Sequence, residues 1–122
     1  MPENKKIELK RYLLSDSNYL SGKLKGKEAR KDLELDKFDK NNGHMIIFIS
    51  EEIIGIGFSF FLGLFSPSIK KLGEKKFRKR FIFDYENIQT EKLVKLDVEY
   101  GINRVLEART FIDVLFGVIC SG

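Results

Sequence analysis

The chain has 122 residues, which is enough for one domain with a buried core, and its apolar fraction of 43% is ordinary for a folded protein. Its net charge of +4, from 22 basic and 18 acidic residues, is too small to indicate nucleic-acid binding by itself. The single cysteine, Cys120, excludes an internal disulfide and a cysteine-based metal site. The polar start of the chain lacks a signal-peptide pattern, so we expect a cytoplasmic protein.

The first half of the chain predicts two strands, a helix and a third strand. Alternating residues over 6–14 predict a half-exposed strand, and Tyr19 and Leu20 begin a second strand that forms a hairpin with it. Residues 26–38 carry apolar side chains near helical spacing and predict an amphipathic helix. The nearly continuous apolar run 44–50 predicts a central strand that is buried on both faces.

Residues 53–69 carry no charge, a run of borderline length for a membrane-spanning helix. Because glycines and Pro67 interrupt the run, we expect instead a connection followed by a helix that begins at Ser59, and no membrane span. Proline lacks an amide proton and clashes with the preceding turn. We therefore predict two helical pieces, with Ser66 capping the second, Pro67 as its first residue and Gly73 ending it. A single kinked helix is the alternative.

The last third predicts a strand over residues 78–85, whose aromatic residues alternate, and a helix over 90–109 that Gly101 interrupts. An apolar helix over about residues 110–120 should pack on the body or on a partner. The alternation of strands and helices indicates one α/β domain, with its core at about residues 6–109. We expect a mixed, mainly parallel sheet of about four strands packed against helices.

Five segments point to a known family: residues 22–33 (GKLKGKEARKDL), 45–49, 58–62, 81–84 and 101–104. They resemble the STAS-like domain family of uncharacterised prokaryotic proteins (DUF4325). The resemblance covers about residues 7–106 and implies a STAS-like fold. The order of elements is more distantly similar to the STAS domains of anti-sigma-factor antagonists, in which a GHKL-type kinase phosphorylates a serine at the start of a helix. In this sequence that position falls on Ser59.

Two interpretations of Ser59 stay open. A serine at the start of a helix can cap a free backbone amide, which contributes about 1 kcal/mol. It can also accept a phosphate, because a helix N-terminus favours added negative charge. In that case the charge would arise beside Phe58, Phe60 and Phe61, which we take as candidate partner-binding residues, and would disrupt an apolar docking face.

A basic cluster covers residues 70–80, with seven basic residues and one acidic residue. It can be a solvated helix end, a surface for an acidic protein partner, or a contact to nucleic-acid phosphates. No aromatic stacking platform accompanies it. Five of its residues are candidate partner-binding residues: Lys70, Lys71, Lys75, Lys76 and Arg78.

We expect no enzymatic activity and no metal or cofactor. His44 is the only histidine, and Ser59 has phenylalanines where a nucleophile elbow needs glycines. The glycines at Gly55 and Gly57 lack the third glycine of a dinucleotide-binding loop. The leading hypothesis is a non-enzymatic, cytoplasmic regulatory domain that binds protein, with a GHKL-type ATPase or kinase as the implied partner. The alternative is a nucleic-acid-binding accessory protein that uses the basic cluster.

Overall fold

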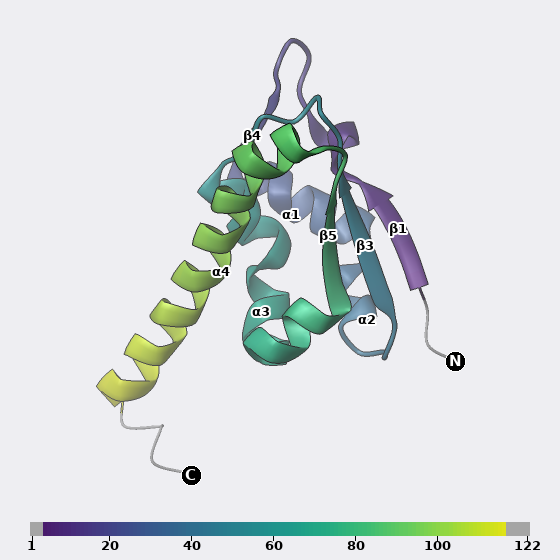
Figure 1. Cartoon of the computed structure of the whole chain (residues 1–122). Helices are drawn as coiled ribbons and strands as arrows, with labels where there is room; N and C mark the ends of the chain where they lie inside the picture. The colour runs from purple at the N-terminus through teal and green to yellow at the C-terminus, as the bar shows by residue number, and fades with distance from the viewer. Residues whose placement is uncertain (1–3, 117–122) are drawn as a thin grey trace.

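The chain forms an α/β fold in which helices pack against a parallel sheet, which confirms the predicted fold class (Figure 1). The computed structural model describes the backbone of residues 4–116 and the side chains of residues 4–108. In chain order the elements are β1 (Asn4–Glu8), a 3-10 helix (Leu9–Tyr12), β2 (Tyr19–Leu20), α1 (Lys23–Asp32), α2 (Leu35–Phe38), β3 (His44–Ile49), β4 (Gly55–Ile56), α3 (Phe58–Arg80), β5 (Phe81–Tyr85) and α4 (Ile88–Phe116).

The strands form two sheets instead of one sheet of about four strands. The main sheet has the order β1-β3-β5 with parallel pairing throughout, and β2 pairs with β4 in a separate parallel ladder. The predicted hairpin between the first two strands is therefore wrong. Instead, the amide of Gly57 donates to the carbonyl oxygen of Leu20 at 2.6 Å, and the ring of Tyr19 lies over Gly55, where a Cβ would collide with it.

The central strand β3 is buried on one face only, so the prediction of two buried faces is wrong. Met45, Ile47 and Ile49 point into the core, whereas Ile46 is 37% exposed and Ile82, its partner on β5, is 45% exposed. The strands follow one another across the sheet in chain order. Right-handed crossovers between them then place the connecting helices on the same face. Within the part of the chain that the structure describes, the other face is exposed at Ile46 and Ile82.

Two N-terminal elements are shorter than the sequence predicts. The first strand ends at Glu8, and a 3-10 helix follows whose Leu9 and Tyr12 are buried. The predicted helix over residues 26–38 is two helices, α1 and α2. Glu34 separates them in a left-handed conformation, with φ of 54°, which a continuous helix does not allow.

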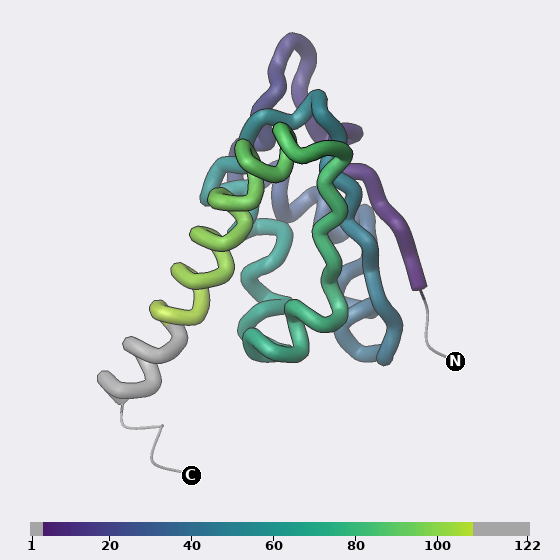
Figure 2. Tube along the Cα trace, in the orientation of Figure 1, coloured from purple at the N-terminus to yellow at the C-terminus, as the bar shows by residue number. Residues whose placement is uncertain are grey.

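Helix α3 continues through Pro67, so the predicted start of a second helix at Ser66 and Pro67 is wrong. The helix breaks instead at Gly73, whose φ of 80° and ψ of 168° are not helical. Figure 2 shows that the teal and green trace of α3 bends within its length. A positive φ is a conformation that glycine adopts readily. Gly73 was predicted as a helix end, and that position is confirmed.

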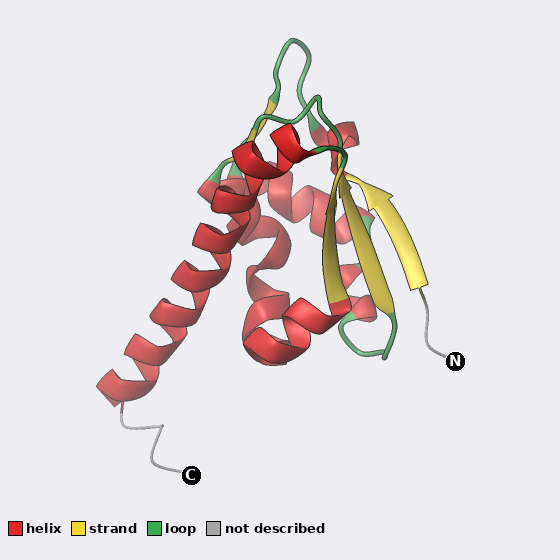
Figure 3. Cartoon of the chain, in the orientation of Figure 1, coloured by secondary structure: helices red, strands yellow, loops and turns green. Residues whose placement is uncertain are grey.

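Helix α4 is continuous from Ile88 to Phe116 (Figure 3), so the predictions of an interruption and of a separate C-terminal helix are wrong. Gly101 does not break the helix. Its role is to let α4 approach α3, since a Cβ there would collide with the ring of Phe61. The final residues of the predicted C-terminal helix, 117–120, lie outside the described residues, as does the packing of side chains from residue 109 onward.

Aromatic rings fill the space between the sheet and the helices. Phe65 of α3 lies at the centre, with ring centroids 5.2 Å from Phe61, 5.8 Å from Phe77 and 5.8 Å from Phe81. The pairs of Phe65 with Phe77 and Phe81 are edge-to-face, an arrangement that is favourable beyond the burial of area. Within residues 4–116, none of the helices has the length and apolar character that crossing a membrane requires.

Candidate binding groove

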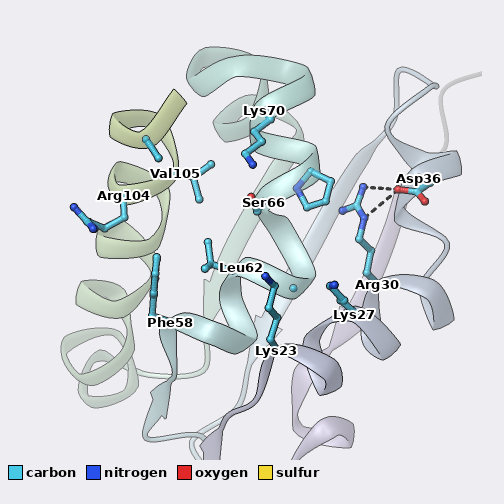
Figure 4. Close-up of a pocket in the computed structure, with 13 residues that line it drawn as sticks. Lys23, Lys27, Arg30, Asp36, Phe58, Leu62, Ser66, Lys70, Arg104 and Val105 are labelled. Atoms are coloured by element: carbon cyan, nitrogen blue, oxygen red, sulfur yellow. Dashed lines mark hydrogen bonds and ion pairs between the residues drawn. The ribbon is translucent and has the colours of Figure 1, made fainter. Parts of the chain in front are cut away.

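A groove of about 650 Å³ lies over α3, between α1 and α4 (Figure 4). Partly exposed apolar side chains form its floor, and basic side chains stand around them. The lining residues are Lys23, Lys27 and Arg30 from α1, Asp36 from α2, Phe58, Leu62, Gly63, Ser66, Pro67 and Lys70 from α3, and Arg104, Val105 and Ala108 from α4. The groove thus joins segments from both halves of the sequence.

Two glycines allow α1 and α3 to cross at close range beneath this groove. A Cβ on Gly26 would collide with the carbonyl oxygen of Phe60, and a Cβ on Gly63 would stand 2.8 Å from the amide nitrogen of Lys27. Such distances leave no room for a side chain. The close crossing keeps the α1 wall directly beside the α3 floor, and Lys23 and Lys27 line the groove one helical turn apart.

Arg30 locks α1 to α3 and α2 at one side of the groove. Its guanidinium donates to the carbonyl oxygen of Leu64 at 2.9 Å and to the hydroxyl of Ser68 at 2.8 Å. It also binds the carboxylates of Asp36 at 2.7 Å and Asp39 at 2.8 Å. Because two carboxylates neutralise it, Arg30 contributes structure to the groove more than positive charge.

Three lysines keep their charge available at the groove. Lys23, Lys27 and Lys70 are exposed and form no ion pair with any residue whose side chain the structure describes. Arg104, on the α4 wall, bonds the carboxylate of Glu107 at 3.3 Å on its own helix. Since Asp36 is the only carboxylate among the described lining residues and is held by Arg30, the groove is positively charged.

Ser59 does not line the groove and does not cap the helix, so the predicted cap is wrong. Helix α3 begins one residue earlier, at Phe58, and its N-cap is Gly57, which makes no side-chain cap bond. Ser59 is therefore the second helical residue, and its side chain is exposed. Its neighbour Phe58 lines the groove and packs edge-to-face on Tyr100 of α4, with ring centroids 5.5 Å apart.

Two predicted partner-binding residues, Phe60 and Phe61, are fully buried in the core and cannot contact a partner. The helical repeat explains the difference. A step of about 100° per residue puts Phe58 and Leu62 on the groove side of α3 and turns Phe60 and Phe61 toward the core.

The basic cluster of residues 70–80 does not form one surface. Lys70 lines the groove, while Arg78 bonds the carboxylates of Glu74 at 3.0 Å and Glu99 at 2.8 Å. The hydrogen bond from Arg78 holds the pKa of Glu99 below its usual value. The kink at Gly73 separates Lys70 from the later residues of the cluster.

The remaining basic residues of the cluster have different surroundings. Arg80 is buried and donates to the carbonyl oxygens of Gly43 at 2.8 Å and Phe38 at 2.7 Å, so it belongs to the core. Lys71, Lys75 and Lys76 are exposed, and none of them lines the groove. The sequence cluster is therefore divided among the groove, a surface ion-pair network, exposed lysines outside the groove, and the core.

Sequence reasoning missed most of the groove, namely Lys23, Lys27, Leu62 and Arg104. A signal for one wall exists, because two lysines spaced by four residues fall on one face of a helix. Nothing in the local pattern places α4 beside them. Within the described residues, no group of three or more His, Cys, Asp or Glu side chains could hold a metal ion.

No family model, no curated protein and no solved structure matches this chain. The resemblance to STAS-like domains therefore stays a prediction. A functional proposal has to rest on the groove and on the residues around it.

Proposed function

We propose that the chain is a non-enzymatic regulatory domain that holds a segment of a protein partner in the groove between α1, α3 and α4. The observation that carries this proposal is the combination of an accessible apolar floor with lysines that lack acidic partners among the described residues. Apolar floors with a few charged groups at the margin are typical of binding grooves. A partner that covers Phe58 and Leu62 and offers carboxylates to Lys27 and Lys70 would satisfy both features.

The chemistry of the groove supports a binding role over a catalytic one. Ser66 is the one hydroxyl among the described residues that line it. General base catalysis would need a base within hydrogen-bonding reach of that hydroxyl. The lining carboxylate, Asp36, is already bound by Arg30, and His44 stands at the start of β3, outside the groove.

Phosphorylation of Ser59 is the proposed means of regulation. Ser59 is exposed in the first turn of α3 and directly follows Phe58, whose ring packs edge-to-face on Tyr100. A phosphate there would add about two negative charges beside an aromatic contact at the groove margin, which changes what can dock. The distant similarity to anti-sigma-factor antagonists makes a GHKL-type kinase the candidate enzyme.

Affinity purification with matched variants tests the binding role. We expect a partner protein that is recovered with the wild-type chain, is lost with Leu62→Asp, and is retained with Leu96→Asp, because Leu96 is 74% exposed and lies outside the groove. Thermal unfolding of each variant shows whether it is folded. Recovery of the same proteins with both folded variants would contradict the proposal.

Intact-mass measurement tests the switch separately. After co-expression with the GHKL-type kinase candidate, we expect a phosphate on Ser59 and none in Ser59→Ala. Ser59→Glu should weaken recovery of the partner. An unmodified Ser59, together with full partner binding by Ser59→Glu, would remove the switch and leave the binding role in place.

The structure gives no observation that favours the nucleic-acid alternative. The basic cluster that suggested it is divided, with Arg80 buried and Arg78 paired with Glu99. A phosphate backbone is bound by cations arranged along one surface. That alternative stays a prediction, and a salt titration of DNA or RNA binding checks it.

A further inference from the structure

We infer that the partner segment in the groove is an acidic amphipathic helix. This inference rests on the proposed function, that the groove binds protein, and names the kind of segment it binds. The shape of the groove, its apolar floor and the positions of its cations each support it.

The groove has the shape of a trough for a helix. Helix α3 forms the floor from Phe58 to Lys70, and α1 and α4 form the walls (Figure 4). Lys70 comes twelve positions after Phe58, which corresponds to a length of about 18 Å at 1.5 Å per residue. A partner helix of about three turns matches that length. Insertion of an amphipathic helix into an apolar groove is a recurrent mode of peptide recognition.

The floor offers apolar contacts along its length. Phe58 and Leu62 are half-buried, one turn apart on α3, and Pro67 is exposed farther along the same helix. The partner should therefore present apolar side chains at helical spacing, i, i+3 or i+4 and i+7. Burial of the exposed parts of these side chains would supply the hydrophobic contribution to the binding free energy.

The cations surround the floor and do not converge on one point. Lys23 and Lys27 stand on the α1 wall, Lys70 lies farther along α3, and Arg104 is on the α4 side (Figure 4). A single phosphate group needs donors that meet around one anion. A helix with acidic residues flanking its apolar stripe places carboxylates on both sides. The one-turn spacing of Lys23 and Lys27 matches carboxylates spaced by three or four residues.

A photo-crosslinking amino acid placed at Leu62 of the full chain identifies the segment that occupies the groove. We expect crosslinks that map, by peptide mass spectrometry, to a segment with an apolar face and a net negative charge. Crosslinks to a protein segment that is basic, or that has no helical apolar spacing, would overturn this inference and leave the proposed function standing. Absence of any protein crosslink would overturn the proposed function itself.

Charge reversal in this protein and in the partner segment tests the contribution of ion pairs to binding. With the crosslinked segment synthesised as a fluorescent peptide, Lys27→Glu with Lys70→Glu should weaken binding about tenfold, which corresponds to roughly 1.4 kcal/mol for two exposed contacts. Acid-to-lysine changes in the peptide should restore it. The control Lys31→Glu with Lys76→Glu alters two exposed lysines outside the groove and should leave binding unchanged. Equal effects of both variants, or no rescue, would overturn the inference.

Discussion

Gly26 of α1 and Gly63 of α3 meet where the two helices cross, and a Cβ on Gly63 would stand 3.1 Å from the carbonyl carbon of Gly26. The backbone of each helix thus occupies the space that a side chain would need on the other. This crossing positions Lys23 and Lys27 beside the α3 floor of the groove. The two glycines therefore serve the packing of two helices, although glycine is a poor helix former.

Replacing the first of these glycines should destabilise the protein. Gly26→Ala gains about 1 kcal/mol of helix propensity but forces a methyl group against the carbonyl oxygen of Phe60. Overpacking of this kind costs about 1–3 kcal/mol, so we expect a net decrease in the free energy of unfolding. Urea denaturation measures it, with Lys31→Ala, an exposed change on the same helix, as the control. A Gly26→Ala protein more stable than wild type would contradict the close crossing.

The two carboxylates bound by Arg30 should differ sharply in their effect on stability. The side chain of Asp39 is 2% exposed and also accepts a hydrogen bond from Ser68, whereas that of Asp36 is 86% exposed. Breaking a buried ion pair from one side costs about 3–5 kcal/mol, and an exposed pair contributes at most about 1 kcal/mol. Asp39→Ala should therefore lower the free energy of unfolding far more than Asp36→Ala. Equal losses in denaturant titrations would show that the network is not buried.

Removal of the Ser59 hydroxyl should have little effect on stability. A capping serine contributes about 1 kcal/mol, but the N-cap of α3 is Gly57. We expect Ser59→Ala to change the free energy of unfolding by less than about 0.5 kcal/mol, as exposed substitutions usually do. A loss near the capping value would mean that the hydroxyl bonds a free amide of the first turn. The measurement separates a structural role from the proposed regulatory one.

The ion pair between Arg78 and Glu99 should make stability fall at low pH. The hydrogen bond from Arg78 lowers the pKa of Glu99 below its ordinary value of 4.5. A carboxyl group with a lowered pKa in the folded state stabilises the protein above the unfolded pKa, and this contribution is lost as the pH falls through the folded pKa. The expected loss thus begins near pH 4.5 and continues below it.

An NMR titration of the Glu99 carboxyl group checks this assignment. Arg78→Gln should raise the pKa of Glu99 toward 4.5 and weaken the acid dependence of stability. Arg104→Gln is the matched control, because Arg104 pairs with Glu107 and not with Glu99. If both variants titrate like the wild type at Glu99, the ion pair does not form in solution.

The features that the sequence predicted well depend on short-range patterns. The strand predicted over residues 78–85 exists only from Phe81 to Tyr85, because residues 78–80 are the last residues of α3. Within β5 the predicted alternation is present, with Ile82 on the exposed face. Gly73 marks a real break, because its backbone conformation is one that glycine adopts readily. Strand β3 was likewise predicted nearly to its observed bounds, because a run of apolar β-branched residues indicates a strand.

The predictions that were wrong involve residues whose neighbours come from distant parts of the chain. Pro67 was expected to begin a new helix, but α3 continues through it. Three residues before it, the carbonyl oxygen of Leu64 accepts a hydrogen bond from Arg30 of another helix. Gly101 was expected to interrupt α4, but it lies against Phe61 of another helix. Neither contact can be predicted from the neighbouring residues in the sequence, because the packing of the helices decides which residues meet.

The sequence by itself determined the α/β class, because the alternation of apolar strands with amphipathic helices has few stable arrangements. Two of the residues predicted from the sequence to bind a partner, Phe58 and Lys70, line the groove, and their role in binding stays a prediction. Only the tertiary structure decided that Phe60 is buried and that Arg80 belongs to the core. The groove itself is a product of packing. Helices α1, α3 and α4 form its floor and walls. Ion pairs between residues far apart in the chain decide which of its charged side chains stay unpaired.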